Sequence, residues 1–289
     1  MKDIRYYLEK AQKEKFAIPQ FNFSDFTQMK AILASAEKMK SPVILGTSEG
    51  ESKFFGLDEA VALRNVLSKK TGVPMFLNLD HGKSFEYLKQ AIDAGYDMVH
   101  FDGSKLSLEE NIKITKQVVK YAKKKNVTVE GEVGKLGTDS SKLYSEKFEI
   151  NEDNLTKLVD AEKYVKATKV DLLAVSVGNF HGIEISGIDP NLRLDVLAKI
   201  HKNLEDKFLV LHGGSGTPED DIKKAIKLGV VKININTELR LAFSGNLRRA
   251  LYNDKEEIVP YKFLADAKSS VEKVVALKIK LFDSENKIY

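Results

Sequence analysis

The sequence contains no cysteine, so neither a disulfide framework nor a thiolate metal site is available to it. Any metal ion must therefore be held by histidine and carboxylate side chains. No segment approaches roughly 18 consecutive apolar residues, so no transmembrane helix is predicted. The N-terminal stretch MKDIRYYLEKAQKEK is charged and amphipathic and lacks the apolar core of a signal peptide. We therefore expect a cytoplasmic protein without a membrane partner.

A strong charge imbalance is also missing. The chain has 46 basic and 42 acidic residues, a formal net charge of +4, which gives no reason to expect nucleic acid as a partner. This balance still permits binding of an anionic small molecule where positive charge is concentrated locally. With 43% apolar and 30% charged residues over 289 positions, the composition is typical of a soluble globular protein.

Eight short apolar runs have the composition of buried strands, and stretches with helical periodicity separate them. In residues 107–125, for example, Leu108, Ile112 and Val119 fall on one helical face. The strand-like runs are 16–22, 42–48, 74–80, 97–103, 127–134, 172–178, 208–214 and 230–237. The other helical stretches are near 26–39, 58–70, 84–94, 152–167, 192–203 and 218–228, with a last region from 238 onward.

Eight strands alternating with helices in a chain of 289 residues predict a (β/α)8 barrel of the TIM type, an α/β fold. The main alternative, a doubly wound sheet, normally carries a glycine-rich fingerprint after its first strand. Here the first strand runs into PQFNFSD, without glycine. No Pro/Gly/Ser-rich linker interrupts the chain, so we expect residues 1–289 to form a single barrel domain with additional C-terminal helices from about residue 238.

Three of the five histidines share one setting, in which each lies at or just past the C-terminal end of a predicted strand and precedes a glycine. They are His81 in LDHG, His181 in NFHG and His212 in VLHG. In a barrel the C-terminal ends of the strands converge on one face, where active sites are built. Three imidazoles on that face predict a zinc site with one open coordination position. We expect His100 to be a hydrogen-bonded interior residue and His201 to lie on a solvated helix surface.

Carboxylates accompany these histidines at the strand ends. Asp80 directly precedes His81, and Asp102 ends the fourth predicted strand. Glu130 and Glu132 lie two residues apart in the fifth strand, so alternation places both on the same face. We expect at least one of them to point into the top of the barrel. Pairing of Glu132 with a nearby lysine is the alternative.

Two segments after the last two strands are suited to binding phosphate. HGGSGTPED places Gly213, Gly214 and Ser215 just before a predicted helix. NINTEL, residues 234–239, places Thr237 at the start of the next helix. Backbone N–H groups at helix N-termini bind anions. The loops after strands seven and eight of such barrels frequently hold a phosphate.

Together these motifs resemble the class II, metal-dependent fructose-bisphosphate aldolase family, which includes tagatose-bisphosphate aldolases. The similarity extends from IPQFNFSD through SPVILGTSEG, LDHG, FDGS, VEGEVG and HGGSG to KININTEL. The family resemblance implies reversible cleavage of a ketose 1,6-bisphosphate into dihydroxyacetone phosphate and glyceraldehyde 3-phosphate, a step of glycolysis and gluconeogenesis. It also implies a homo-oligomer, a dimer or a tetramer.

The resemblance implies roles for the residues at the strand ends. His81, His181 and His212 match the ligands of the catalytic zinc ion. Asp80 matches the group that donates and accepts a proton at the aldehyde oxygen. That role explains why a buried strand ends in two ionisable groups, because one of them binds the metal and its neighbour acts on the substrate.

The resemblance extends to further ligand contacts. Asp102 and Glu132 match ligands of a second or alternative divalent metal position, and a monovalent cation is another candidate cofactor. Ser48 matches a contact to glyceraldehyde 3-phosphate. The residues that match the dihydroxyacetone-phosphate site are Gly182, Gly213, Gly214, Ser215, Asn234, Ile235, Asn236 and Thr237.

Two features leave the substrate and part of the mechanism open. Asn236 lies where fructose enzymes of the family often carry Asp and tagatose enzymes carry Ala, and its polar side chain favours fructose. The segment 134–153 is a long irregular loop, either a lid or a plain surface excursion, and departs from the acidic cluster usual in the family. Asp139 and Glu146 both lie in it, so the base for the C1 proton is not assigned.

Two alternatives concern the C-terminal helices and the class of function. Arg248 and Arg249 either bind the second phosphate in a neighbouring subunit or lie on a solvated helix face. A barrel that binds metal and sugar phosphate without turnover is the rival class of function. Asp80 argues against it, because a pure binding protein does not need an unligated carboxylate beside its metal.

Overall fold

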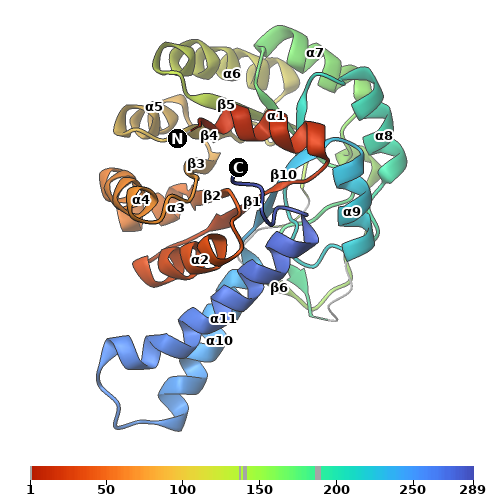
Figure 1. The fold of residues 1–289 in the computed structure, drawn as a ribbon. Helices are drawn as coiled ribbons and strands as arrows, with labels where there is room; N and C mark the ends of the chain where they lie inside the picture. The colour runs from red at the N-terminus through yellow and green to blue at the C-terminus, as the bar shows by residue number, and fades with distance from the viewer. Residues whose placement is uncertain (1, 137, 139–141, 186–189) are drawn as a thin grey trace.

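The computed structural model describes residues 2–136, 138, 142–185 and 190–289. Eight parallel strands close into a barrel in the order β1-β10-β9-β7-β5-β4-β3-β2, and helices surround it (Figure 1). The (β/α)8 barrel predicted from the sequence is confirmed, and each predicted run supplies one strand. The strands are β1 Ile18–Asn22, β2 Val43–Ser48, β3 Met75–Gly82, β4 Met98–Phe101, β5 Thr128–Val133, β7 Leu172–Val175, β9 Phe208–Leu211 and β10 Val230–Ile235.

The helices begin and end where local side chains satisfy their backbone groups. Ser107, for example, caps α6 and exchanges hydrogen bonds with Glu110 three residues later. Within the described residues, no helix is both long and apolar enough to cross a membrane. The helices are α1 Ile4–Glu14, α2 Phe26–Lys38, α3 Glu49–Phe55, α4 Leu57–Thr71, α5 Phe85–Ala94, α6 Leu108–Ala122, α7 Leu158–Thr168, α8 Leu194–Asn203, α9 Glu219–Lys227, α10 Thr237–Asn253 and α11 Pro260–Leu281.

The end of the barrel at which the strands begin is apolar and closed. The amphipathic N-terminal stretch forms α1, which buries Tyr7 and Leu8 against the barrel interior. The rings of Tyr7 and Phe76 lie 5.7 Å apart between their centroids. Further inward-facing apolar side chains, among them Ile18 and Ile44, complete this layer. Substrate access at this end is therefore blocked by packing.

Inward positions become polar toward the C-terminal ends of the strands. On β4, alternation turns Met98 into the apolar layer and then His100 and Asp102 into the layers above it. Across the interior, Asn78 Nδ2 donates to Gln20 Oε1 at 2.8 Å. Buried polar groups are stable only with such partners. The half of the barrel at the C-terminal ends of the strands therefore contains the polar and ionisable side chains, and the half at the N-terminal ends contains the apolar packing.

The segment 134–153, predicted to be irregular, contains a short strand. β6 Leu143–Tyr144 pairs in parallel with β8 Ile183–Glu184, just after His181. Thr138 Oγ1 donates to the carbonyl of His181 at 2.6 Å. The sequence did not predict β6, because its partner β8 lies far along the chain. The pairing joins the segment to the loop that carries His181.

α10 and α11 form a hairpin whose tip projects from the barrel (Figure 1). α10 begins at Thr237, which agrees with the helical region predicted from about residue 238. α11 also packs on α2, where Ser35 Oγ donates to the carbonyl of Glu272 at 2.8 Å. Every fourth residue of α11 is buried, which is the spacing of one helical face; these residues are Ala267, Val271, Val275 and Ile279.

We predict that Ile279→Ala lowers the free energy of unfolding by about 2–5 kcal/mol, because the side chain is fully buried in the core between helices and barrel. Leu277→Ala on the same helix is the matched control, since Leu277 is 66% exposed. It should change stability by no more than about 0.5 kcal/mol. Urea unfolding of both variants measures the difference. Equal midpoints would show that α11 does not contribute to the core.

Candidate metal centre and active site

An irregularity at the end of β3 brings Asp80 and His81 to the same side of the strand. The pairing register of β3 with β4 shifts between Leu79 and Gly82. His81 has a φ of +50°, in the left-handed region that residues other than glycine seldom adopt. In a regular strand, consecutive side chains point to opposite faces. The shift instead lets both side chains line the same cavity.

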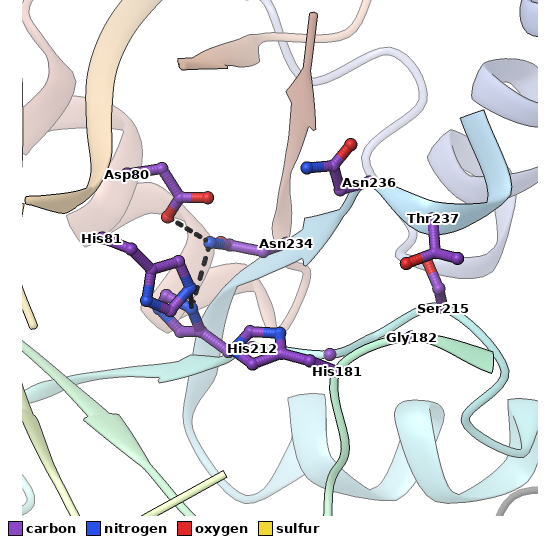
Figure 2. Close-up of a pocket in the computed structure, with 10 residues that line it drawn as sticks. Asp80, His81, His181, Gly182, His212, Ser215, Asn234, Asn236 and Thr237 are labelled. Atoms are coloured by element: carbon purple, nitrogen blue, oxygen red, sulfur yellow. Dashed lines mark hydrogen bonds between the residues drawn. The ribbon is translucent and has the colours of Figure 1, made fainter. Parts of the chain in front are cut away.

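Two imidazoles meet at the centre of this cavity (Figure 2). His81 Nδ1 donates to Asp102 Oδ2 at 3.0 Å, and His212 Nε2 donates to Glu130 Oε1 at 2.6 Å. These contacts leave His81 Nε2 and His212 Nδ1 facing each other at 3.1 Å. Two nitrogen lone pairs at this distance repel each other unless a proton or a metal ion binds both. Two nitrogens on one tetrahedral zinc ion stand about 3.3 Å apart, so the pair fits zinc.

The electrostatics of the cluster favour a cation. Burial opposes charge on His81, but the carboxylates of Asp80 and Asp102 outweigh it and raise the pKa of His81 above its ordinary value. Burial lowers the pKa of His212, so that ring is neutral and offers a lone pair. Neutral nitrogen donors beside carboxylates are the surroundings in which a divalent metal binds.

His181, the third predicted ligand, lies on the loop after β7. Its ring centroid is 4.8 Å from that of His81 and 6.2 Å from that of His212. Burial and the two neighbouring imidazoles lower the pKa of His181 well below its ordinary value, which keeps this ring neutral. The structure therefore brings the three predicted imidazoles to one cavity, and His81 is the nearest to both of the others.

A fourth imidazole, that of His100, joins the cluster. It is fully buried on β4, and its ring centroid lies 4.8 Å from that of His81 and 4.7 Å from that of His212. The expected interior histidine is therefore present, but its place within the site was not predicted. The signal that points to it is alternation, because His100 is two residues before Asp102 on the same strand.

The two glutamates of β5 have different partners. Glu130 and Lys232 are both fully buried, with Nζ 2.8 Å from Oε2. Burial opposes ionisation of Glu130, but Lys232 offsets it and the pKa of Glu130 falls well below its ordinary value. Glu132 Oε2 lies 3.2 Å from His100 Nε2 and 4.0 Å from His81 Nδ1. Glu130, rather than Glu132, therefore forms the ion pair with a lysine. The sequence did not identify Lys232 as that lysine.

Ligand-type atoms converge in two groups within the described residues. Asp102, which resembles a ligand of a second metal, is held in this structure by His81 and by Ser104. The N–H and Oγ of Ser104 donate to Asp102 Oδ1 at 3.1 and 2.6 Å. Asp102 thereby orients the His81 ring, the usual task of a carboxylate behind a metal-binding histidine. The groups are Asp80, His81, His100 and His212, and His81, Asp102 and Glu132.

Asp80 is held by two amides. Asn234 Nδ2 donates to Oδ1 and Asn22 Nδ2 donates to Oδ2, each at 3.0 Å. Burial raises the pKa of Asp80, but the neighbouring His81 and other basic groups outweigh it, and the pKa lies well below its ordinary value. Asp80 is therefore an ionised carboxylate in a fixed orientation. Asn22 was not predicted, although alternation from Gln20 along β1 places it on the inner face.

One cavity extends from Asp80 and the three predicted imidazoles to the start of α10 (Figure 2). Ser215 and Thr237 lie at its far end. The Asn236 side chain projects into the space between these two residues and Asp80. No donor among the described residues reaches the buried Asn236 Oδ1. Because buried oxygens normally have partners, this one indicates a ligand position. The lining residues are Asp80, His81, His181, Gly182, His212, Gly213, Ser215, Asn234, Asn236 and Thr237.

Some residues of the predicted substrate sites lie differently. Ile235 is buried in the core outside the barrel wall, and Gly214 packs against β10, and neither residue lines the cavity. Gly213 has a φ of +63°, and a Cβ there would lie 1.9 Å from a carbonyl oxygen, so no larger residue fits. Ser48 lines a second, wider cleft that shares Asp80 with the first.

Of the four charged residues considered from the sequence, three do not line the cavity, and Asp139 lies outside the described residues. Glu146 is exposed and lines neither the cavity nor the wider cleft. Arg248 and Arg249 are exposed on α10 (Figure 1), and neither lines the cavity or the cleft of their own chain. The C1 base remains unassigned.

We predict that His181→Ala loses most of its bound zinc on dialysis, because a three-imidazole site then keeps only two ligands. His201→Ala is the control. His201 was expected on a solvated surface but is half-buried on α8, against Gly229 and far from the cavity. Its replacement should leave zinc content unchanged. Elemental analysis of both dialysed proteins makes the comparison, and equal zinc content would remove His181 from the ligand set.

Comparison with known proteins gives one consistent family. Residues 2–287 match the family model described as fructose-bisphosphate aldolase class-II. The 6-phospho-5-dehydro-2-deoxy-D-gluconate aldolase of Shouchella clausii (strain KSM-K16) is 39% identical over 283 residues, covering 97% of this chain and 94% of that protein. The fructose-bisphosphate aldolase of Geobacillus stearothermophilus is 38% identical over 292 residues, covering 98% and 97%.

A solved structure agrees with these sequence relatives. The crystal structure of the YdjI aldolase from Escherichia coli K12 matches with a TM-score of 0.83 and 29% sequence identity, over 100% of both chains. The match to the family model and the relatives above 30% identity cover almost the whole chain. The chain therefore belongs to the class II fructose-bisphosphate aldolase family.

Proposed function

We propose that this protein catalyses the reversible, zinc-dependent aldol cleavage of fructose 1,6-bisphosphate to dihydroxyacetone phosphate and glyceraldehyde 3-phosphate. One observation carries the proposal: a single cavity contains the facing nitrogens of His81 and His212, the carboxylate of Asp80 and the start of α10. These groups offer one substrate a Lewis-acid position, a proton acceptor and an anion site. The reaction would serve glycolysis and gluconeogenesis.

The proposed chemistry assigns each side chain one task. His81, His181 and His212 would hold a zinc ion, which would supply a Lewis acid for the ketone half of the substrate. Asp80 accepts the proton of the C4 hydroxyl as the C3–C4 bond breaks and C4 becomes the aldehyde carbon. The bonding electrons pass to the ketone half. In the synthetic direction Asp80 returns the proton to the new hydroxyl.

The phosphate of the ketone half fits the far end of the cavity. The first N–H groups of a helix have no intrahelical partners and bind anions. At the start of α10, the Asn236 side chain at the N-cap makes no capping hydrogen bond, and Ser215 Oγ accepts from the N–H of Glu238 at 3.4 Å. Ser215 and Thr237 add hydroxyl groups at the cavity wall. Gly213 leaves the space that a side chain would fill.

The aldehyde half fits the wider cleft. Ser48 lines it together with Lys83 and Lys105, whose side chains are exposed. The ammonium groups of three lysines that line this cleft, Lys83, Lys105 and Lys142, favour a second anionic group on the substrate. Charge alone does not distinguish a phosphate from a carboxylate. A substrate with a phosphate at this end and a substrate with a carboxylate there therefore both fit the charge of the cleft.

A second candidate substrate is 6-phospho-5-dehydro-2-deoxy-D-gluconate. Relatives named as its aldolases are 39% and 38% identical to this chain, against 38% for a fructose-bisphosphate aldolase. That compound ends in one phosphate and one carboxylate, which also suits the two anion-binding ends. Tagatose 1,6-bisphosphate, which differs from the fructose compound at C4, is the remaining candidate.

The test is a cleavage assay with these three compounds, before and after metal removal by EDTA. We expect the highest kcat/KM for fructose 1,6-bisphosphate, loss of activity after chelation and recovery with zinc. Borohydride added with substrate should not inactivate the enzyme, because no lysine Schiff base forms. A higher kcat/KM for another compound would replace the proposed substrate, and cleavage by the metal-free protein would overturn the mechanism. Absence of any cleavage would favour a binding function.

The assembly and further ions are also proposals. We propose a cytoplasmic homodimer or homotetramer in which Arg248 and Arg249 reach the second phosphate in a neighbouring subunit. The position of both arginines on the projecting hairpin supports this. A second divalent ion would bind Asp102 and Glu132, whose oxygens lie near His81, and a monovalent cation would assist phosphate binding. A fully active monomer in sedimentation would exclude the shared site.

We predict that Asn236→Ala shifts the ratio of fructose to tagatose bisphosphate cleavage toward tagatose. Asn236 presents to the cavity an oxygen that receives no hydrogen bond from the described residues, and its loss removes one hydrogen bond to the substrate. One such bond contributes about 0.5–1.5 kcal/mol, so the ratio should change by roughly threefold to tenfold. Comparison of kcat/KM for both epimers measures it. An unchanged ratio would limit Asn236 to positioning the phosphate.

We predict that Asp80→Asn keeps near-normal zinc content but reduces cleavage by roughly 10²–10⁴-fold, because the variant cannot accept the hydroxyl proton. Exchange of the dihydroxyacetone-phosphate C1 proton with solvent should survive better, since it does not involve the C4 oxygen. Zinc stoichiometry, cleavage rate and proton exchange are measured on the same preparation. If Asp80 instead bound or oriented the metal, zinc and both activities would fall together.

A further inference from the structure

We propose that His100 is a positioning residue of the metal centre, which holds the backbone of His81 in the one conformation that presents its imidazole to the metal. The inference rests on the proposed metal centre and is independent of which sugar phosphate is cleaved. It concerns a side chain that neither touches the substrate in the mechanism above nor belongs to the three predicted zinc ligands.

The backbone of His81 needs an external support. Its φ of +50° is unfavourable for a residue with a side chain, and such conformations persist only where the surroundings fix them. The β3–β4 register shift at this point also removes the regular ladder hydrogen bonds that would otherwise hold the residue. A relaxed His81 would return to the regular alternation and turn its ring away from Asp80.

His100 supplies that support with a buried hydrogen bond. The N–H of His81 donates to His100 Nδ1 at 3.1 Å, and His100 is fully buried. A backbone N–H can only donate, so Nδ1 must keep its lone pair. In the neutral ring the proton then lies on Nε2, which faces Glu132 Oε2 at 3.2 Å. One imidazole thereby lies between the His81 N–H, from which it accepts, and the carboxylate of Glu132.

β4 fixes His81 at a second point as well. Asp102, two residues beyond His100, accepts from His81 Nδ1 at 3.0 Å, and its own N–H donates to the carbonyl of Gly82 at 2.9 Å. A Cβ at Gly82 would lie 3.1 Å from the carbonyl oxygen of His100, so the two strands approach closely here. His100 holds the N–H of His81, and Asp102 holds its ring. Together they determine where His81 Nε2 points.

The same contacts argue against His100 as a metal ligand. Its atoms belong to the group that converges on Asp80, His81 and His212. However, Nδ1 is used by the His81 N–H, and Nε2 faces Glu132. A metal ion on Nδ1 would displace the His81 N–H, and one on Nε2 would lie against Glu132 rather than between His81 Nε2 and His212 Nδ1. His100 is therefore assigned to positioning rather than to ligation.

The test uses three variants that separate the two nitrogens of His100. His100→Phe removes both polar contacts and keeps a planar ring. His100→Asn keeps an acceptor near the position of Nδ1 but does not reach Glu132. His100→Gln places an amide near the position of Nε2 but offers no acceptor to the His81 N–H. Zinc affinity is measured by competition with a chelator, and the cobalt-substituted proteins are compared by their visible absorption, which reports ligand geometry.

The proposal expects a specific order of affinities. His100→Phe should bind zinc about 10- to 100-fold more weakly than the parent protein, the usual effect of losing a group that orients a ligand. His100→Asn should recover most of the affinity and the parent cobalt spectrum, whereas His100→Gln should resemble His100→Phe. Thermal unfolding of the zinc-free proteins identifies any variant that does not fold.

Other results would overturn the inference. Affinity equal to the parent in all three variants would show that the support is not needed. Recovery by Gln but not Asn would assign the effect to Glu132, and equal loss in all three would indicate direct ligation or packing. If the parent itself binds no zinc, the metal centre fails and the inference with it. Failure of the proposed substrate in a zinc-binding parent would leave the inference standing.

One measurement on the unaltered protein keeps the question decidable if the variants do not fold. Nitrogen-15 spectra of the zinc-loaded protein, labelled in its five histidines, distinguish the two ring nitrogens of each residue. We expect His100 to show an unprotonated Nδ1 and a protonated Nε2. A proton or a metal ion on His100 Nδ1 would exclude the hydrogen bond from His81 and overturn the proposal.

Discussion

The buried pair of Glu130 and Lys232 is the interaction on which the rest of the centre depends. Both side chains are fully buried, with 2.8 Å between Nζ and Oε2. Removing one partner of such a pair leaves an uncompensated charge and costs about 3–5 kcal/mol. With its charge compensated, Glu130 uses its other oxygen to fix the His212 ring at 2.6 Å. His212 Nδ1, which faces His81 Nε2, is thus oriented from inside the barrel.

This arrangement is possible because apolar side chains fill one end of the barrel and ionisable side chains line the other. At the closed end, Tyr7 of α1 and Phe76 of β3 pack with other apolar side chains and contribute stability. At the open end, carboxylates and imidazoles compensate one another, and their geometry is fixed by hydrogen bonds rather than by shape. Strained features such as the φ of His81 are tolerated there because the lower half holds the strands in register.

The sequence predicted the barrel because strands buried on both faces produce continuous apolar runs that stand out between helical stretches. It also located Asp80 and His81 at a strand end. It did not reveal how both face the cavity, because the β3–β4 register shift depends on long-range pairing. The sequence did not identify Lys232 for a related reason. A single lysine in a strand has no local pattern, and its partner Glu130 lies on β5, which is not adjacent to β10 in the barrel.

Overall similarity does not decide the substrate, because the two ends of the site are built differently. At the end near α10, a Cβ on Gly213 would lie 1.9 Å from a carbonyl oxygen, so the backbone itself forms the cavity wall and tolerates little change. At the other end, Ser48, Lys83 and Lys105 line an open cleft, where substitutions change charge without disturbing the barrel. Relatives with different named substrates at 39% and 38% identity are what this construction predicts. In the proposed function, specificity for the second anionic group would depend on a few side chains of the cleft, and exchanging them between relatives should move the preference while the cluster around His81 stays the same.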